Sequence, residues 1–287
     1  MQADGPSHGS APTGAPARII LLSDFGTVDG YPAAMRGVIS TIAPGAVVAD
    51  ATHEIASGDV AAAAYVLARY ARFHPPGTIH VAVVDPGVGS TRRALAARID
   101  DQLYVAPDNG LLTRVLQHAS SSRIVTIEAE AYRQRDVSAT FHGRDIFAPA
   151  AAWLARGLPL DRLGAPIDDP VLLELLQPQR IGDHVQGVVE YIDRFGNLIT
   201  NIPAAWLDGS ARVTIRGRDV GPLCTTYSDA MPGSPLALTG SDGMLEIAVR
   251  DGSAAAFLGV ERNAAVDVRA VPRGNIIFAT ENTEDTG

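Results

Sequence analysis

The chain has almost no cysteine, with Cys224 standing alone among 287 residues. An intrachain disulfide is therefore excluded, and so is a metal site built on a CxxC pair. Because disulfides accumulate in oxidising compartments, a reducing, cytoplasmic location is the simplest expectation. Long apolar runs are also missing: no stretch approaches the roughly 20 residues of a membrane-spanning helix, and the start lacks the segments of a secretory signal. We therefore expect no membrane partner.

Positive charge is scarce as well, with 23 Lys and Arg residues against 32 Asp and Glu and a formal net charge of −9. The arginines are scattered and form no basic block, so we expect no nucleic acid partner. The GxxxxGK[ST] phosphate loop and the GxSxG nucleophile elbow are absent. Their absence disfavours a nucleotide-phosphate site and a serine hydrolase.

The first part of the chain alternates apolar, branched runs with helical patterns. Residues 17–26 and 78–89 each look like a buried strand running into a loop, while 32–44 and 58–73 have helical spacing. This alternation predicts an α/β domain with a largely parallel sheet. After about residue 170 short alternating runs separated by glycine turns predict a smaller β domain. The expected organisation is a disordered tail over 1–16, the α/β domain over 17–170, a linker over 171–183, the β domain over 184–275 and a tail over 276–287.

Acidic residues follow several of the strand-like runs in the first domain. Asp24, Asp50, Asp85 and Asp108 each come just after such a run, and three of them stand in the loops SDFGTVDG, VVDPGVGSTRR and APDNG. Asp and Gly often do no more than make a turn. Ligands of parallel sheets, however, bind beyond the carboxyl ends of the strands. Three such loops in one domain therefore predict a lined pocket.

His142 precedes the helical pattern of 144–155 and is followed by Gly143. A lone histidine at a helix start is usually a structural residue. The alternative is that a small molecule approaches Gly143, which has no side chain, while His142 acts on it. A metal held by Asp85, His53 and His142 is a further alternative, but no HxH or HExxH pairing supports it. We predict neither a metal nor a cofactor.

Six segments occur in an order that resembles one family. They are LLSDFGTVDGYPAAMRGVI, VAVVDPGVGSTRR, YVAPDNGLL, TFHGRDIFAPAAAWLA, YIDRFGNLITNI and GSDGMLEIAVRDGSAAAFLG. Together they resemble the S-adenosyl-L-methionine (SAM) hydroxide adenosyltransferases, which are related to the fluorinase and chlorinase enzymes. The resemblance covers residues 18 to about 272. It implies a larger N-terminal α/β domain and a smaller C-terminal β-barrel-like domain, with subunits assembled as homotrimers whose active sites lie between subunits.

The resemblance also implies roles for individual residues. Asp85, Arg92 and His142 would handle the attacking water, Asp24 would bind both ribose hydroxyls, and Asp29 would lie near the methionine end. The remaining substrate-binding residues implied by the family are Phe141, Gly143, Asp193, Phe195, Asn197, Ser241, Ser253 and Ala255. Two positions depart from the family pattern: Gly58 stands where a Gln or Trp is common, and Arg250 where an Asn is common. Both departures affect the expected substrate contacts.

The implied reaction is attack of water or hydroxide on the ribose 5′ carbon of SAM, which gives adenosine and L-methionine. The sulfonium is already activated, so the chemistry needs positioning more than a metal or a covalent nucleophile. A SAM-dependent halogenase is the alternative with the same substrate, although a carboxylate at Asp85 would repel a halide. A non-catalytic adenosine or SAM sensor would keep Asp24 and Asn197 but would not need the Asp85, Arg92 and His142 set.

Overall fold

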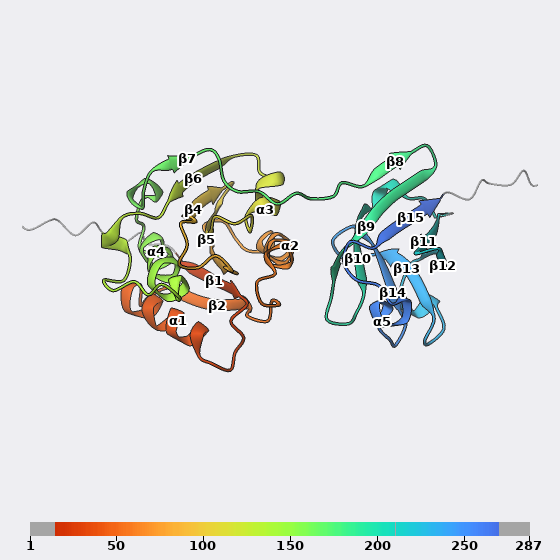
Figure 1. Ribbon diagram of the computed structural model, residues 1–287, viewed down its shortest axis with the longest axis horizontal. Coiled ribbons are helices and arrows are strands. Elements are labelled where there is room, and N and C mark those ends of the chain that lie inside the picture. Colours follow the sequence, from red (N-terminus) through yellow and green to blue (C-terminus); the bar gives the residue numbers. More distant parts are fainter. Residues whose placement is uncertain (1–14, 210, 270–287) are drawn as a thin grey trace, which may run out of the picture. The chain divides into compact units, whose positions relative to one another are not determined.

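The computed structural model describes residues 15–209 and 211–269. These residues form two compact units that divide between Glu174 and Leu175 (Figure 1). The predicted tail over 276–287 lies outside the described residues, and so does the tail over 1–16 except for its last two positions.

The first unit is built on a seven-stranded sheet with the strand order β2-β1-β3-β5-β4-β6-β7. The pairings from β2 to β5 are parallel, which confirms the prediction for the strands that lead to the acidic loops. The remaining pairings are antiparallel. Only two residues separate β4 from β5, too few for the crossover that a parallel pair requires. The strands are β1 (Arg18–Ser23), β2 (Val47–Thr52), β3 (Ile79–Val83), β4 (Ala94–Ile99), β5 (Gln102–Pro107), β6 (Ser122–Thr126) and β7 (Pro166–Ile167).

Helices cover both faces of this sheet (Figure 1). On one face, α1 buries Met35 and Ile39 against α4 and the sheet. On the other face lie α2 and α3, and α2 is capped by Asp59, whose carboxylate accepts a 2.9 Å hydrogen bond from the amide of Ala62. The helices are α1 (Tyr31–Ile42), α2 (Val60–Ala71), α3 (Thr113–Gln117) and α4 (Ala148–Ala155), with short turns η1 (Glu130–Tyr132), η2 (Gly143–Phe147) and η3 (Leu160–Arg162).

The second unit is a closed β-barrel, as predicted. Its ring follows the order β10-β14-β13-β12-β11-β15-β9 and closes because β10 also pairs with β9. β8 pairs with β9 beside the ring, so the stretch expected as a linker contains a strand of this unit. The elements are β8 (Gln179–Ile181), β9 (His184–Ile192), β10 (Leu198–Pro203), η4 (Ala204–Trp206), β11 (Arg212–Ile215), β12 (Arg218–Cys224), η5 (Tyr227–Asp229), β13 (Pro235–Thr239), β14 (Met244–Val249), α5 (Ala254–Leu258) and β15 (Ala265–Arg269).

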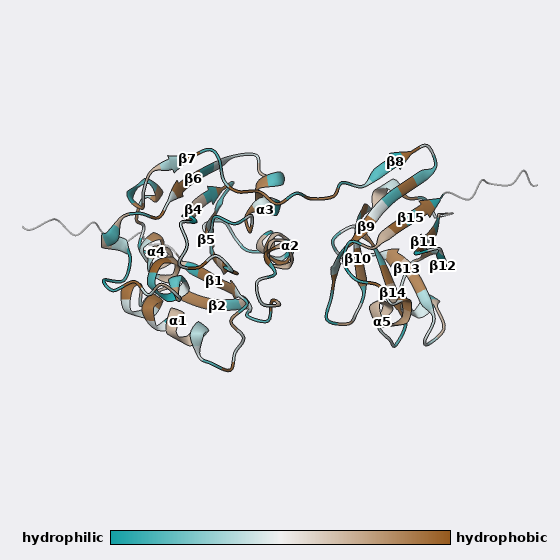
Figure 2. Ribbon diagram, in the orientation of Figure 1, coloured by the Kyte–Doolittle hydropathy of each residue, from teal (hydrophilic) through white to brown (hydrophobic). Residues whose placement is uncertain are grey.

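Each unit has its own apolar core, and Figure 2 shows apolar residues gathered on the strands of both. The core of the first unit includes Leu21, Val81 and Phe147, all fully buried or nearly so. That of the second includes Leu198 and Ile247. Within residues 15–209 and 211–269, no helix combines the length and the apolar character needed to cross a membrane.

Candidate active site

A cavity of about 340 Å³ opens at the carboxyl ends of β1 and β3. Its wall includes the polar side chains of Asp24, Asp85 and His142 together with the rings of Phe25, Tyr31 and Phe141. The volume falls within the usual range for a small-molecule site. The edge of the sheet predicted from the acidic loops therefore does carry a pocket.

A larger cavity of about 580 Å³ lies at the opposite end of the sheet, beside His74, Asp101 and His118. The buried Gln102 in its wall is occupied by structural hydrogen bonds, since its amide nitrogen donates to the carbonyls of Ala71 and His74. At the smaller cavity, by contrast, the lining residues Asp85 and His142 are joined by hydrogen bonds through Arg92. We therefore take the smaller cavity as the candidate active site.

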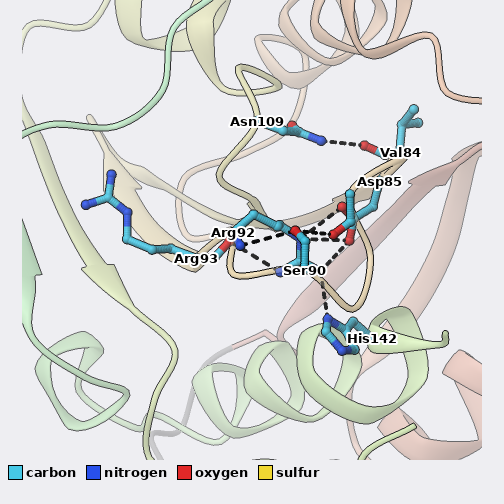
Figure 3. A network of polar contacts seen from close by, with 8 residues as sticks. Val84, Asp85, Ser90, Arg92, Arg93, Asn109 and His142 are labelled. Atoms are coloured by element: carbon cyan, nitrogen blue, oxygen red, sulfur yellow. Dashed lines mark hydrogen bonds and ion pairs between the residues drawn. The ribbon is translucent and has the colours of Figure 1, made fainter. Parts of the chain in front are cut away.

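Asp85 and His142 line this cavity, and both are in direct contact with Arg92 (Figure 3). The Nε of Arg92 donates to both carboxylate oxygens of Asp85, at 2.9 and 3.0 Å. Its Nη2 also donates to Asp85 Oδ2 and lies 2.7 Å from Nδ1 of His142. The side chains of Asp85 and Arg92 are only 4% and 10% exposed. Arg92 thus stands between a buried carboxylate and an imidazole, and bonds both.

The ring of Phe147 helps to hold Arg92 in this position. The guanidinium carbon lies 5.3 Å from the ring centroid, within the range of a cation–π contact. Phe147 is fully buried in η2, a π-helical turn that begins directly after His142. Such turns are rare and concentrate at functional sites. The predicted helix therefore starts one turn later, at Ala148, and the wider turn carries the residues that follow His142.

The loop that carries Asp85 and Arg92 needs a glycine at position 89. Gly89 has φ +79°, in the left-handed region, and a Cβ placed there would lie 2.5 Å from the carbonyl oxygen of Ala139. Any larger residue would push the Asp85 loop away from the loop that leads to His142. Glycine is therefore required where the two loops touch.

The contact with Arg92 determines the state of His142. A guanidinium has donors and no acceptor, so Nδ1 of His142 must accept and the ring hydrogen belongs on Nε2. Partial burial lowers the pKa of His142, and the charge of Arg92 lowers that pKa further, although Asp85 opposes the shift. The imidazole is therefore neutral near pH 7. In this arrangement His142 is a hydrogen-bond donor at Nε2.

Gly143 is also required, for a different reason from the one expected. A Cβ at this position would lie 3.1 Å from Cε2 of Phe25 and 3.3 Å from the sulfur of Met35. The glycine therefore makes room for protein packing next to the cavity, in addition to lining it. The ring of Phe25 packs edge-on against Tyr31 and Phe141, with centroid separations of 6.0 and 5.7 Å. Sequence reasoning missed Phe25, which lies in the same glycine loop as Asp24, and Tyr31, the first residue of α1 directly after that loop.

Asp24 lines the cavity, and its Oδ2 accepts a 2.8 Å hydrogen bond from the amide of Gly58. Gly58 also lines the cavity, so this departure from the family pattern bears directly on the site. Asp29 is exposed in the loop before α1 and is not part of the cavity wall. Within this unit the structure therefore places Asp24, but not Asp29, in the cavity wall beside Asp85 and His142.

The third acidic loop does not reach the cavity. Asp108 is 6% exposed and accepts hydrogen bonds from Nε of Arg93 and from the amide of Val171, at 2.7 and 2.8 Å. Arg93 also pairs with Asp169. This loop therefore anchors the chain that leaves the first unit. Its neighbour Asn109 donates a 2.8 Å hydrogen bond to the carbonyl of Val84, directly before Asp85 (Figure 3).

In the second unit, most of the residues expected to bind substrate gather at one end of the barrel. Asp193 Oδ1 accepts from the amides of Phe195 and Asn197, and the Asn197 side chain donates to Asp193 Oδ2. The amide of Ala255 donates to the carbonyl of Gly196, next to Ser253, which caps α5. Phe195 is 77% exposed.

Ser241 does not belong to this group. It precedes β14, whose first residue pairs with the last residue of β10, whereas Asn197 precedes the first residue of β10. The six residues of β10 separate the two ends by about 17 Å. The other departure from the family pattern, Arg250, is occupied by the carbonyls of Ser228 and Ala230, to which its Nη1 donates.

The side chains considered as metal ligands have other partners. His142 and Asp85 bind Arg92, while Nδ1 of His53 lies 2.7 Å from the hydroxyl of Ser23. Among the residues that the structure describes, no group of three or more His, Cys, Asp or Glu side chains is arranged to hold a metal ion.

Comparison with known proteins identifies two domain types in this chain. Residues 19–164 match the SAM hydroxide adenosyltransferase N-terminal domain, and residues 187–267 match the C-terminal domain of the same family. The chain belongs to the SAM hydroxide adenosyltransferase family.

Several relatives carry an enzyme name. The (R)-S-adenosyl-L-methionine hydrolase of Thermus thermophilus is 40% identical, over 86% of this chain and 98% of its own. That of Salinispora tropica is 39% identical, over 84% and 94%. A fluorinase from an Actinoplanes species is more distant, at 29% identity over 80% and 90%. A crystal structure of an uncharacterized conserved protein from Thermotoga maritima superposes with a TM-score of 0.83 at 36% identity, covering 88% of this chain and 99% of the other.

Proposed function

We propose that this protein is a SAM hydrolase, in which water attacks the ribose 5′ carbon and releases adenosine and L-methionine. Relatives named as SAM hydrolases match it at 38–40% identity over most of their length. The observation that carries the proposal is that Asp85 and His142 line a small-molecule cavity and are joined by hydrogen bonds through Arg92.

Each member of this group has a distinct task in the proposed reaction. A carboxylate oxygen has more than one lone pair, so Asp85 can accept a hydrogen from the attacking water while it remains paired with Arg92. His142 donates from Nε2 to a lone pair of the same water and orients it. As the new C–O bond forms, the C–S bond breaks, the sulfur keeps the electron pair as a neutral thioether, and the water proton passes to Asp85. Positioning of this kind contributes roughly 7–11 kcal/mol.

Asp24 holds the ribose in the proposed complex. The two oxygens of a carboxylate can accept hydrogen bonds from the two hydroxyls of a cis-diol. The amide of Gly58 donates to Oδ2 of Asp24 and so fixes the orientation of this carboxylate. The rings of Phe25, Tyr31 and Phe141 line the same cavity and exclude water from the reacting centre.

A halogenase with the same substrate is the competing function, since fluorinases are among the relatives. A halide would have to enter a site where the carboxylate of Asp85 is 4% exposed. Although Arg92 compensates its charge, an ionised carboxylate offers only hydrogen-bond acceptors, whereas a halide is held by donors. A pure sensor of SAM or adenosine would gain nothing from this buried group. The cavity therefore favours water as the nucleophile.

We extend the proposal to a cytoplasmic homotrimer that shares each active site between subunits. Asp193, Phe195, Asn197, Ser253 and Ala255 would then serve the substrate bound at the neighbouring subunit's cavity. Two observations support this. These residues gather at one end of the barrel, and Phe195 there is 77% exposed, like Val28 near the cavity at 91%. Light scattering that finds an active monomer would overturn the trimer.

The decisive experiment uses SAM in oxygen-18 water and mass spectrometry of the nucleoside. We expect one labelled oxygen in adenosine, at the 5′ position, and none in methionine. The same incubation with chloride or fluoride tests the halogenase, which would give 5′-halogenated nucleoside. Tight binding of SAM with no product at all would leave the sensor as the function.

A further inference from the structure

One buried titratable group beside the cavity has no role in the chemistry described above. His53 is 4% exposed and lies in the loop after β2. Its Nδ1 is 2.7 Å from the hydroxyl of Ser23, and its Nε2 is 3.1 Å from Oδ1 of Asp50. Asp50 in turn pairs with Arg36 of α1. At Nε2 the alignment falls short of a hydrogen bond, so Asp50 is a close neighbour of this nitrogen and not a bonded partner.

These neighbours fix the direction of the hydrogen bonds. The carboxylate of Asp50 favours a hydrogen on Nε2 of His53, so Nδ1 is the acceptor and the hydroxyl of Ser23 donates to it. The same hydroxyl oxygen accepts from the amide of Phe25, at 3.3 Å. Ser23 is therefore held on both sides, by its own loop and by His53.

The loop that contains His53 also forms hydrogen bonds with the segment around Asp24. Ser23 directly precedes Asp24, and the amide of Gly26 donates a 2.8 Å hydrogen bond to the carbonyl of His53. The amide of Gly58, later in the same loop, donates to the Asp24 carboxylate. The chain before Asp24, the chain after it and its side chain are thus all tied to residues 53–58.

We infer that His53 is a positioning residue for substrate binding, which holds the carboxylate of Asp24 in the cavity by way of Ser23. The inference rests on the proposed function, because it assigns Asp24 to the ribose. His53 itself is not part of the cavity wall and touches no reacting atom. Losing it should therefore weaken binding of the ribose and leave the chemical step at Asp85, Arg92 and His142 intact.

Two substitutions separate the two ends of the imidazole. Asparagine in His53→Asn places an amide near the position of Nδ1 and can still accept from Ser23. Glutamine in His53→Gln reaches toward Asp50 and leaves Ser23 without its acceptor. Ser23→Ala removes the same bond from the other side. We expect His53→Gln and Ser23→Ala to raise both KM for SAM and Kd for adenosine about three- to tenfold, the size of one lost hydrogen bond, with kcat within about twofold. His53→Asn should recover most of the affinity.

Two controls make the result specific. The double variant Ser23→Ala with His53→Gln should bind no worse than Ser23→Ala alone, because Ser23→Ala already removes the contact with His53, together with that to the amide of Phe25. His80 is a second fully buried histidine of this unit, bonded to Gln102 at the opposite end of β3. His80→Asn should lower Tm while leaving KM within about twofold.

The inference is overturned if the wild type hydrolyses SAM but Ser23→Ala and His53→Gln keep its KM and adenosine Kd. It is equally overturned if these variants lose kcat instead of affinity, or if His53→Asn binds no better than His53→Gln. A wild type that releases no adenosine from SAM refutes the proposed function, while the adenosine Kd values still decide the role of His53.

Discussion

Two groups of the same three residue types flank the cavity, in opposite orders. In one, Arg92 stands in the middle and bonds both Asp85 and His142. In the other, Asp50 stands in the middle and contacts both Arg36 and His53. A central arginine can only donate, so it leaves a carboxylate and an Nε2–H to act on a ligand. A central carboxylate only accepts, so its histidine presents Nδ1 to the protein. The group with a central arginine is therefore suited to acting on a ligand. The group with a central carboxylate is suited to holding the protein chain in place.

The largest effect should come from His142→Ala. Removing the donor that orients the attacking water should lower kcat about 10²-fold or more, the size expected when a reacting group is misplaced. Affinity for adenosine should change little, because the imidazole faces the water. Steady-state kinetics and adenosine calorimetry measure the two quantities. A kcat equal to that of the wild type would contradict the assignment of the Arg92 group to the reaction.

A smaller loss is expected from Arg92→Lys. A single ammonium cannot reproduce the planar fork that bonds Asp85 and His142 together, so kcat should fall about tenfold or more at nearly unchanged KM. Arg93→Lys is the matched control, because Arg93 is adjacent in sequence but pairs with Asp108 and Asp169. That variant should lose thermal stability and keep kcat. Equal kcat losses in the two would mean that charge alone matters at position 92.

Asp24→Asn tests the proposed role of Asp24 in binding the ribose. Neutralising the acceptor of the ribose hydroxyls should raise KM about tenfold with little change in kcat, the usual cost of a charge-assisted hydrogen bond. Asp161→Asn, at an exposed surface pair with Arg123, should have no effect. If calorimetry shows normal SAM binding by Asp24→Asn, the ribose contact is wrong. The role of His53 in positioning Asp24 for substrate binding would then be wrong as well.

The smallest effect concerns pH. Burial, reinforced by Arg92, lowers the pKa of His142 below its usual value of 6.5, so the imidazole is neutral at pH 7. Protonation would place a hydrogen on Nδ1 against Arg92, so kcat should decline as pH falls through that lowered pKa, on the acid side of 6.5. Burial and Arg36 also lower the pKa of His53. Because His53 supports binding alone, His53→Asn should keep the midpoint of the kcat profile within about 0.3 pH unit. A shift of that midpoint would contradict the separation.

Local pattern was sufficient to predict much of this molecule. The alternation of runs gave the α/β unit, and α1 stops just before Pro44 as its spacing predicts. The partners of side chains could not be predicted in the same way. Asp24 and Asp108 occupy equivalent places after parallel strands, yet one faces the cavity and the other anchors residue 171. That difference depends on contacts more than 60 residues apart, which no local pattern contains. The same holds for His53, whose partner Ser23 lies on another strand.

Two adjacent arginines have a consequence for how this loop can change in length. Arg92 binds Asp85 and His142, while Arg93 binds Asp108 and Asp169. Side chains of neighbouring residues in extended chain point to opposite sides. Inserting or deleting one residue between Gly87 and Ala94 would therefore shift the two arginines relative to Asp85 and Asp108 and separate them from their partners. Homologous sequences that retain the activity should tolerate substitutions in this loop but keep its number of residues constant.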